Sequence, residues 1–161
     1  MQITNDDIPY VGPDTPGGQW LRRYWMPVAL SSELYDIPRA LKIMDEELVL
    51  FRDGNGRMGL LGQHCAHRGA SLEYGDIEKA GIRCPYHGWL YDVEGKCLEQ
   101  PSEKNGKDFC AKVRHISYPV RELGGLVFAY LGPNPADPPP LPNYSPLIDH
   151  GGIRQIEPVR H

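Results

Sequence analysis

The stretch "CAHRGASL" at residues 65–72 and its partner "CPYHGWLYD" at residues 84–92 decide how this chain is interpreted. Each stretch places a cysteine shortly before a histidine, as Cys-x-His in the first and Cys-x-x-His in the second. Thiolate and imidazole ligands suit zinc, copper and iron–sulfur clusters, whereas calcium and magnesium prefer oxygen ligands. The two stretches together predict one metal site. Its candidate ligands are Cys65, His67, Cys84 and His87.

The chain that leads into the first stretch predicts a β-hairpin. Residues 47–53 and 57–63 are strand-like, and the "DGNG" at residues 53–56 is a strong turn signal. The return strand delivers the chain directly to Cys65. The first ligand loop is therefore expected to begin where a strand ends.

Further short strands are expected around the second stretch. Residues 81–83 predict a strand that ends at Cys84, and residues 89–100 predict a hairpin that turns at Glu94-Gly95. Residues 115–132 predict two more strands around a pair of glycines. No stretch shows sustained helical periodicity, so the fold class is expected to be all-β.

The composition agrees with short strands joined by many turns. Glycine and proline account for 18 and 16 of the 161 residues. The formal net charge of −4 gives no basic surface for nucleic acid. No apolar run is long enough to span a membrane, and residues 1–18 lack the pattern of a secretory signal. We therefore expect a soluble cytoplasmic protein with no nucleic-acid partner and no membrane association.

Three segments are expected along the chain. Residues 1–19 form a polar N-terminal lead, and residues 20–132 form the folded domain. Residues 133–161 form a linker and C-terminal tail, and residues 133–146 within it contain seven prolines. Because proline cannot donate to a sheet ladder, this stretch is expected to be a stiff extended linker or wrap.

A structural zinc site is the alternative to an iron–sulfur site. Zinc fingers with two Cys and two His ligands usually take both cysteines from one knuckle and both histidines from a helix. Here each loop supplies one cysteine and one histidine, and no helical pattern follows. A chain of 161 residues also needs no metal to build a core. Zinc is therefore the weaker alternative.

Four further cysteines and histidines are not expected to be ligands. Cys97 and Cys110 are expected to be buried or half-buried thiols, because neither has a neighbouring histidine at ligand spacing. His64 and His115 are expected to be strand-end histidines without a role.

The two stretches closely resemble the cluster-binding loops of Rieske 2Fe-2S proteins, whose pattern is C-x-H, then 15–17 residues, then C-x-x-H. In this chain sixteen residues separate the two halves. The resemblance covers about residues 20–132. It implies a Rieske-type antiparallel β-sandwich with a small cluster-binding subdomain of two loops.

In that family the two cysteines hold one iron and the two histidines hold the other. The resemblance therefore implies that Cys65 and Cys84 bind the inner iron. His67 and His87 would bind the outer iron, near the surface. Two thiolates neutralise a core of two ferric ions and two sulfides, whereas four would leave it negative. The mixed ligands therefore make the cluster easier to reduce than an all-cysteine cluster.

The flanking residues favour one branch of the family. Rieske proteins of cytochrome bc type carry an additional cysteine in each loop, and this sequence has Ala70 and Tyr86 at those places. Arg68 after the first histidine and Trp89 after the second resemble ring-hydroxylating oxygenases. The segments "RRYWMPVAL" and "YPVRELGGLVFAYLGP" are also similar to that family, closest to its phthalate-dioxygenase-like group.

This resemblance implies an oxidoreductase: the electron-transfer domain of a mono- or dioxygenase terminal component in aromatic hydrocarbon catabolism. Such a domain relays electrons to a mononuclear Fe(II) held by two histidines and a carboxylate. No segment of that kind occurs in this sequence, so no catalytic residue is assigned, and the mononuclear iron is expected only in a catalytic domain outside it. A stand-alone Rieske-type ferredoxin is the alternative function.

The resemblance also implies partners. A flavin and iron–sulfur reductase, or a ferredoxin, would donate electrons. The catalytic domain of a neighbouring subunit would accept them through His87, in a homotrimer of the full-length protein.

Five residues beside the candidate ligands are expected to support the cluster. Arg68, Tyr86 and Trp89 would hydrogen-bond or pack around it and tune its potential. Gly69 and Gly88 would allow the loops to pass close to it.

Overall fold

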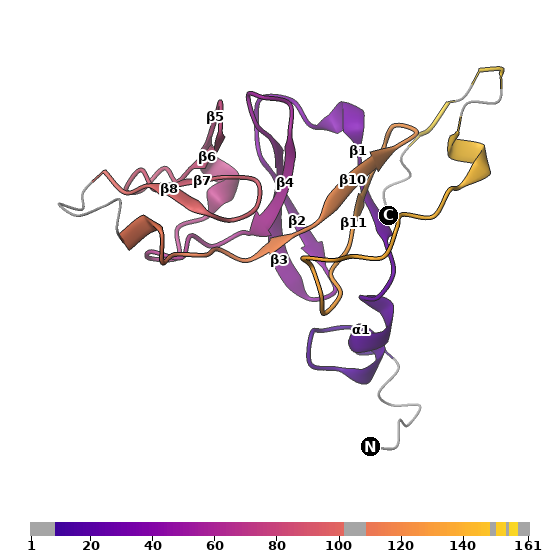
Figure 1. The fold of residues 1–161 in the computed structure, drawn as a ribbon, viewed down its shortest axis with the longest axis horizontal. Coiled ribbons are helices and arrows are strands. Elements are labelled where there is room, and N and C mark those ends of the chain that lie inside the picture. Colours follow the sequence, from indigo (N-terminus) through magenta and orange to yellow (C-terminus); the bar gives the residue numbers. More distant parts are fainter. Residues whose placement is uncertain (1–8, 102–108, 149–150, 154, 158–161) are drawn as a thin grey trace.

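The computed structural model describes residues 9–101, 109–148, 151–153 and 155–157. These residues include the short α-helix α1, three 3₁₀ turns and eleven β-strands in three antiparallel sheets (Figure 1). The predicted all-β class is therefore confirmed. No helix among the described residues is long and apolar enough to cross a membrane.

The three sheets follow one another along the molecule (Figure 1). Helix α1 spans Pro16–Leu21. The first sheet contains β1 (Met26–Leu30), β11 (Leu126–Ala129) and β10 (Val120–Leu123). The middle sheet contains β2 (Arg39–Ile43), β3 (Glu46–Arg52), β4 (Met58–Gly62) and β9 (Ser117–Tyr118). The third sheet contains β5 (Asp76–Glu78), β6 (Gly81–Arg83), β7 (Leu90–Tyr91) and β8 (Cys97–Glu99). The short 3₁₀ turns are Ser31–Glu33, Leu72–Tyr74 and Ser145–Leu147.

Strand β3 is buried on both of its faces, which places the middle sheet between two cores. Successive side chains of a strand point to opposite faces, so its apolar run divides into two sets. Leu48 and Leu50 enter the core shared with the first sheet. Val49 and Phe51 enter the other core, which also contains Cys65. The sequence of β3 therefore builds both cores at once.

The second of these cores lies under the candidate metal site. Its buried members are Val49, Phe51, Leu61, Cys65, Leu72, Ile82, Cys84, Trp89, Tyr91, Cys97 and Cys110. Two predicted ligands are thus part of the hydrophobic core. The loops that carry them are anchored by packing as well as by backbone hydrogen bonds.

The predicted hairpin that leads to Cys65 is confirmed as β3 and β4, paired from Leu48 with Gly62 to Arg52 with Met58. Asp53 makes its turn, because the carboxylate accepts hydrogen bonds from the backbone N–H groups of Asn55 (3.0 Å) and Arg57 (2.8 Å).

The predicted hairpin after the second loop is β7 and β8, with the same kind of turn. Asp92 Oδ1 accepts hydrogen bonds from the backbone N–H groups of Glu94 (3.0 Å) and Lys96 (2.8 Å). Gly95 provides the positive φ of 76° that the turn requires. An aspartate side chain that accepts backbone N–H groups two and four residues later therefore closes both hairpins.

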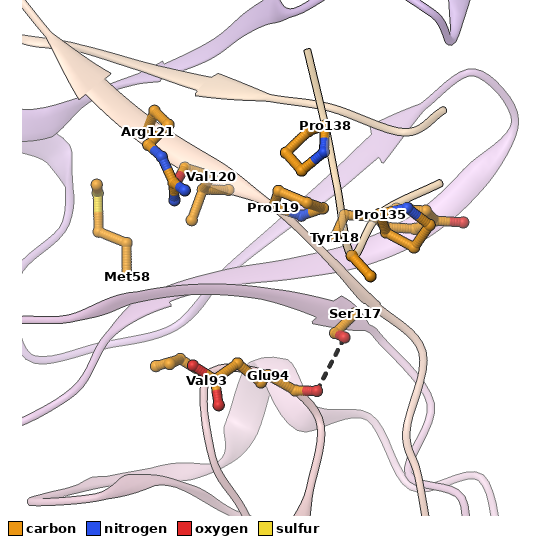
Figure 2. A pocket seen from close by; sticks show the side chains of 11 residues that line it. Met58, Val93, Glu94, Ser117, Tyr118, Pro119, Val120, Arg121, Pro135 and Pro138 are labelled. Carbon is orange, nitrogen blue, oxygen red and sulfur yellow. Dashed lines mark hydrogen bonds between the residues drawn. The ribbon is translucent and has the colours of Figure 1, made fainter. Parts of the chain in front are cut away.

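The proline-rich segment lies against the first sheet instead of extending away from it. The Trp25 indole N–H donates to the carbonyl oxygen of Pro139 (2.7 Å), and the ring of Tyr144 stacks on Phe128. Pro135 and Pro138 line one wall of a cavity of about 540 Å³ (Figure 2). Tyr118, Pro119, Val120 and Arg121 also line it. The segment is therefore a wrap in this part of the structure.

His115 is buried between the middle and third sheets. Its Nε2 lies 2.8 Å from the carbonyl oxygen of Gly62, and its ring packs on Tyr91 at a centroid distance of 4.9 Å. A carbonyl oxygen only accepts, so Nε2 carries the proton. Burial lowers the pKa of His115 below its ordinary value, and the hydrogen bond to Gly62 offsets part of this shift. The interior therefore favours the neutral imidazole.

We expect His115 to make the protein less stable in mild acid. Because its pKa is lowered in the folded state, the unfolded chain binds more protons below about pH 6.5, and stability falls as the pH falls through that range. His115→Gln retains a donor to Gly62 and removes the titration. The unfolding temperatures of variant and wild type are compared at about pH 5.5 and about pH 7.5. The difference between them should shift in favour of the variant at the lower pH. Parallel pH profiles would contradict the prediction.

The two-core arrangement predicts separable effects of two neighbouring substitutions. Leu50→Ala should lower the free energy of unfolding by roughly 2–5 kcal/mol, and Phe51→Ala by roughly 3–5 kcal/mol. Only Phe51→Ala enlarges the core beneath the ligand loops. Metal content measured after chelator challenge under native conditions should therefore fall for Phe51→Ala and stay unchanged for Leu50→Ala. Equal losses would show that the cores are not independent.

Candidate metal centre

The first ligand loop, residues 65–70, follows β4 and closes on its own cysteine. The N–H of Cys65 donates to the carbonyl oxygen of Ala70 (2.9 Å). The N–H of Gly69 donates back to the carbonyl oxygen of Cys65 (2.8 Å). The loop is therefore fixed at both ends without any side chain.

The second ligand loop, residues 84–89, follows β6 and has the same construction. The N–H of Cys84 donates to the carbonyl oxygen of Trp89 (2.8 Å), and the N–H of Gly88 donates to the carbonyl oxygen of Cys84 (3.1 Å). Cysteine is the first residue and glycine the fifth in both loops. Only the position of the histidine differs, third in one loop and fourth in the other.

Both loop glycines adopt a left-handed backbone conformation, with φ of 70° at Gly69 and 73° at Gly88. A side chain there would strain the turn. At Gly69 an added Cβ would meet none of the described protein atoms within 4 Å. The structure therefore explains these glycines first by backbone conformation, a reason that adds to the predicted close approach to the cluster.

The two predicted cysteine ligands are buried, with 3% of each residue exposed. Their thiols lie within interaction distance of each other, and burial raises the pKa of the Cys84 thiol. Backbone N–H groups of Tyr86 and His87 act in the opposite direction. A bound cation would supply the positive charge that thiolates need in this apolar setting.

The two predicted histidine ligands meet across the loops. The ring centroids of His67 and His87 are 4.7 Å apart, at an interplanar angle of 63°. His67 Nδ1 is buried and has no hydrogen-bond partner in the described part of the chain. A buried nitrogen without a partner is unfavourable unless something else binds it. Such a nitrogen, in the loop that carries Cys65, fits a metal ligand.

The predicted neighbours of the histidines occupy different places. Trp89 stacks on the His67 ring, with 4.5 Å between centroids and an interplanar angle of 2°. Tyr86 is exposed and contacts the ring of His87 at a centroid distance of 3.7 Å. Partial desolvation and the nearby charges of His67 and Arg68 lower the pKa of His87. Each half-buried histidine therefore has an aromatic neighbour, a buried one at His67 and an exposed one at His87.

The donor set fits a two-iron cluster. No group of three or more His, Cys, Asp or Glu side chains in the described residues is arranged to hold a metal ion. A Rieske cluster does not require such a group, because each iron takes only two protein ligands and shares the sulfides. Paired thiols on one side and paired imidazoles on the other match that division.

Tyr91 contacts the sulfur of one predicted ligand from within the core. Its Oη lies 3.3 Å from Cys65 Sγ, and the residue is fully buried. A metal-bound thiolate only accepts, so the hydroxyl would be the donor. Burial is the larger cause, and the hydrogen bond with Cys65 the next, of a pKa of Tyr91 well above its usual range. The hydroxyl therefore stays protonated. Local sequence patterns gave no indication of this contact, although Tyr91 lies in the quoted stretch.

His64 and His115 lie near strand ends, as predicted, and both also make specific contacts. His64 Nδ1 faces the carbonyl oxygen of Gly69 (3.2 Å), and Nε2 faces Glu47 Oε2 (2.8 Å). Both partners are acceptors, which favours the imidazolium. The hydrogen bond to Glu47 and that to Gly69 accordingly raise the pKa of His64.

Cys97 and Cys110 are buried free thiols, as predicted. Their sulfurs lie 3.5 Å apart. Burial, and to a smaller extent the hydrogen bond to Cys110, raises the pKa of Cys97 to about 12. The Cys97 thiol is therefore a poor nucleophile.

These loops and their sheet define a class of protein. The family model described as "Rieske [2Fe-2S] domain" matches residues 24–122, and the chain belongs to this family. Members of the family bind a 2Fe-2S cluster, as the sequence predicted.

Oxygenase subunits are the curated relatives of this chain. It is 55% identical to the phenoxybenzoate dioxygenase subunit alpha of Ectopseudomonas oleovorans over 86% of its length, which covers 34% of that protein. It is 45% identical to the phthalate 4,5-dioxygenase oxygenase subunit of Pseudomonas putida over 80% of its length, which covers 30% of that protein. The chain thus spans about a third of the length of these relatives. The predicted similarity to the phthalate-dioxygenase-like group is confirmed.

Solved oxygenase structures share the fold. The crystal structure of apo dicamba monooxygenase matches with a TM-score of 0.70 at 32% identity, over 80% of this chain and 40% of that one. The oxygenase in an oxygenase–ferredoxin complex of carbazole 1,9a-dioxygenase matches with a TM-score of 0.64 at 35% identity, over 74% of this chain and 31% of that one. The predicted Rieske-type architecture is therefore confirmed.

Tyr91→Phe should lower the reduction potential of the cluster by a few tens of millivolts. The lost hydrogen bond stabilises the more negative, reduced state. A difference of about 1 kcal/mol between the two states corresponds to roughly 40 mV for one electron. A spectroelectrochemical titration measures the shift. Tyr118→Phe is the matched control, because it removes a hydroxyl that binds Glu46 (2.6 Å) away from the loops. An unchanged potential in Tyr91→Phe would contradict the assigned contact.

Proposed function

We propose that this chain is the electron-transfer domain of a ring-hydroxylating oxygenase α subunit. The observation that carries the proposal is the pair of identically closed loops, which brings two buried thiols together and two imidazoles to 4.7 Å. Similarity to oxygenase subunits at 55% and 45% identity supports a domain of a larger enzyme over a stand-alone ferredoxin.

The proposed cluster ligands are divided by their surroundings. Cys65 and Cys84, in the core, would bind the inner iron. His67 and His87 would bind the outer iron, with the unpartnered Nδ1 of His67 as its ligand atom. When bound, a cluster of this kind accepts and releases one electron at a time.

The protein side chains around these ligands have separate tasks in the proposal. Tyr91 donates to Cys65 and favours the reduced state. Trp89 covers His67 and excludes water from that side. His87 is half-buried beside the exposed Tyr86 and the positive charge of Arg68, and its imidazole would carry a proton or contact an acceptor there.

The remaining parts of the proposal concern the whole protein. Residues 20–132 would form the Rieske domain, after a lead at 1–19 and before a linker at 133–161 that connects to a catalytic domain with a mononuclear Fe(II). A cytoplasmic reductase or ferredoxin would reduce the cluster. His87 would pass the electron to the catalytic domain of a neighbouring subunit in a homotrimer. The oxygenase–ferredoxin complex of carbazole 1,9a-dioxygenase supports a ferredoxin donor.

The cluster itself is tested on the purified chain. Two irons and two acid-labile sulfides per chain, a visible absorption band and uptake of one electron on reductive titration are expected. The reduced protein should give an EPR signal with an average g value below that of an all-cysteine cluster. A colourless protein with one zinc per chain would refute the proposal.

His87→Cys tests the ligand assignment. An additional thiolate makes the cluster more negative, so the variant should keep a cluster whose reduction potential is lower by roughly 100 mV or more. The measurement is a redox titration followed by EPR. Ser32→Cys is the control for an added thiol, because Ser32 is exposed on the 3₁₀ turn Ser31–Glu33, outside the ligand loops. A wild-type potential in His87→Cys would rule out His87 as a ligand.

A further inference from the structure

The residue that precedes each cysteine holds the carbonyl oxygen of the loop glycine. His64 does this in the first loop, with Nδ1 3.2 Å from the Gly69 oxygen. Arg83 does it in the second loop, where Nη1 donates to the Gly88 oxygen (2.6 Å). Each holding side chain is in turn bound by glutamate. The two loops therefore share a side-chain clamp as well as a backbone closure.

Arg83 makes the more extensive clamp. Its guanidinium bridges Glu78 on β5 and Glu99 on β8, with Nη2 3.0 Å from Glu78 Oε2 and 2.6 Å from Glu99 Oε2. Nε also donates to Glu78. These contacts leave Nη1 directed at Gly88. The hydrogen bond to Glu78 raises the pKa of Arg83 and keeps it charged.

The clamp fixes the peptide that follows His87. The N–H of Gly88 donates to the carbonyl oxygen of Cys84 (3.1 Å), while its own carbonyl accepts from Arg83. Gly88 also needs its positive φ of 73°. A glycine held at both polar groups cannot rotate, so the direction of the preceding histidine is set.

We propose that Arg83 is a positioning residue for the cluster, which fixes the orientation of His87 through the carbonyl of Gly88. This inference rests on the proposed function, because it takes His87 as a ligand. Arg83 touches neither the cluster nor an electron partner in this role. Its effect reaches the site through one backbone carbonyl.

The geometry requires arginine at this position. Three acceptors lie around one planar group, and the guanidinium presents five N–H donors in a fixed fork. A lysine ammonium lies at a single point and cannot meet two carboxylates and the carbonyl with the same directions. Arg83→Lys should therefore restore the ion pairs without restoring the orientation.

A purely structural Arg83 would act differently. It would tie β5, β6 and β8 together, and its loss would lower the unfolding temperature without altering the spectrum of the cluster. The proposal predicts a change in the spectroscopic properties themselves. The two roles are therefore separable by measurement.

The test uses Arg83→Met, which keeps the apolar stem and removes every donor. EPR of the dithionite-reduced full chain should show g-value lines broader than in wild type, because His87 samples several orientations. Release of iron to a chelator should be about tenfold faster, as expected for the loss of a charged hydrogen bond. Arg83→Lys should show the same broadening with a smaller fall in unfolding temperature.

Arg52→Gln is the matched control. Arg52 also joins a turn glycine to a carboxylate, since Nη1 donates to the Gly56 oxygen (3.1 Å) and Nη2 to Glu122 (3.3 Å). It lies at the end of β3, outside the ligand loops. Its loss should leave the EPR lines and the release rate unchanged.

Each outcome has one meaning. Wild-type EPR lines and release rate in Arg83→Met, with only a lower unfolding temperature, would overturn the positioning role. If Arg83→Met fails to fold, Arg83→Lys decides, and a wild-type spectrum there would overturn the role equally. A wild-type protein without any cluster signal would instead refute the proposed function.

Discussion

The backbone hydrogen bond from each loop glycine to the carbonyl oxygen of its own cysteine is the constraint on which the site depends. In both loops it turns the chain within five residues, and the predicted histidine ligand lies within that turn. The ligand atoms are therefore presented by backbone geometry. Because the bond requires a left-handed residue at Gly69 and Gly88, glycine is as necessary to the site as the residues that would bind iron.

The constraint is useful only because both loops begin on strands that share one core. Strand β4 ends before Cys65 and strand β6 ends before Cys84, and both cysteines enter the core that Val49 and Phe51 build from the middle sheet. This arrangement places two thiols in an apolar setting, which raises the pKa of the Cys84 thiol. Without a cation the thiolates would be unfavourable, and without the core the loops would not face each other. Burial and metal binding therefore depend on one another.

Local sequence could predict the parts of this site that are encoded locally. The ligand spacing, the "DGNG" hairpin and the loop glycines all lie within a few residues of one another, and each follows from turn chemistry or ligand chemistry. The clamps could not be predicted in this way. Glu47 reaches His64 from 17 positions away, and Glu99 reaches Arg83 from 16 positions away. Those pairings depend on sheet register, which periodicity leaves undetermined. The contacts of His64 with Glu47 and Gly69 therefore do not follow from the local sequence.

The two proposed histidine ligands have different aromatic neighbours, one buried and one exposed. The His67 ring is covered by Trp89, of which only 5% is exposed. The His87 ring has an exposed Tyr86 beside it, and the charge of Arg68 lies nearby. The buried Trp89 favours retention of the cluster on the side of His67. The exposed Tyr86 marks the side from which an electron partner would approach His87. Arg83 holds the loop that carries His87, so the histidine beside the exposed Tyr86 lies in the loop with the more extensive side-chain clamp.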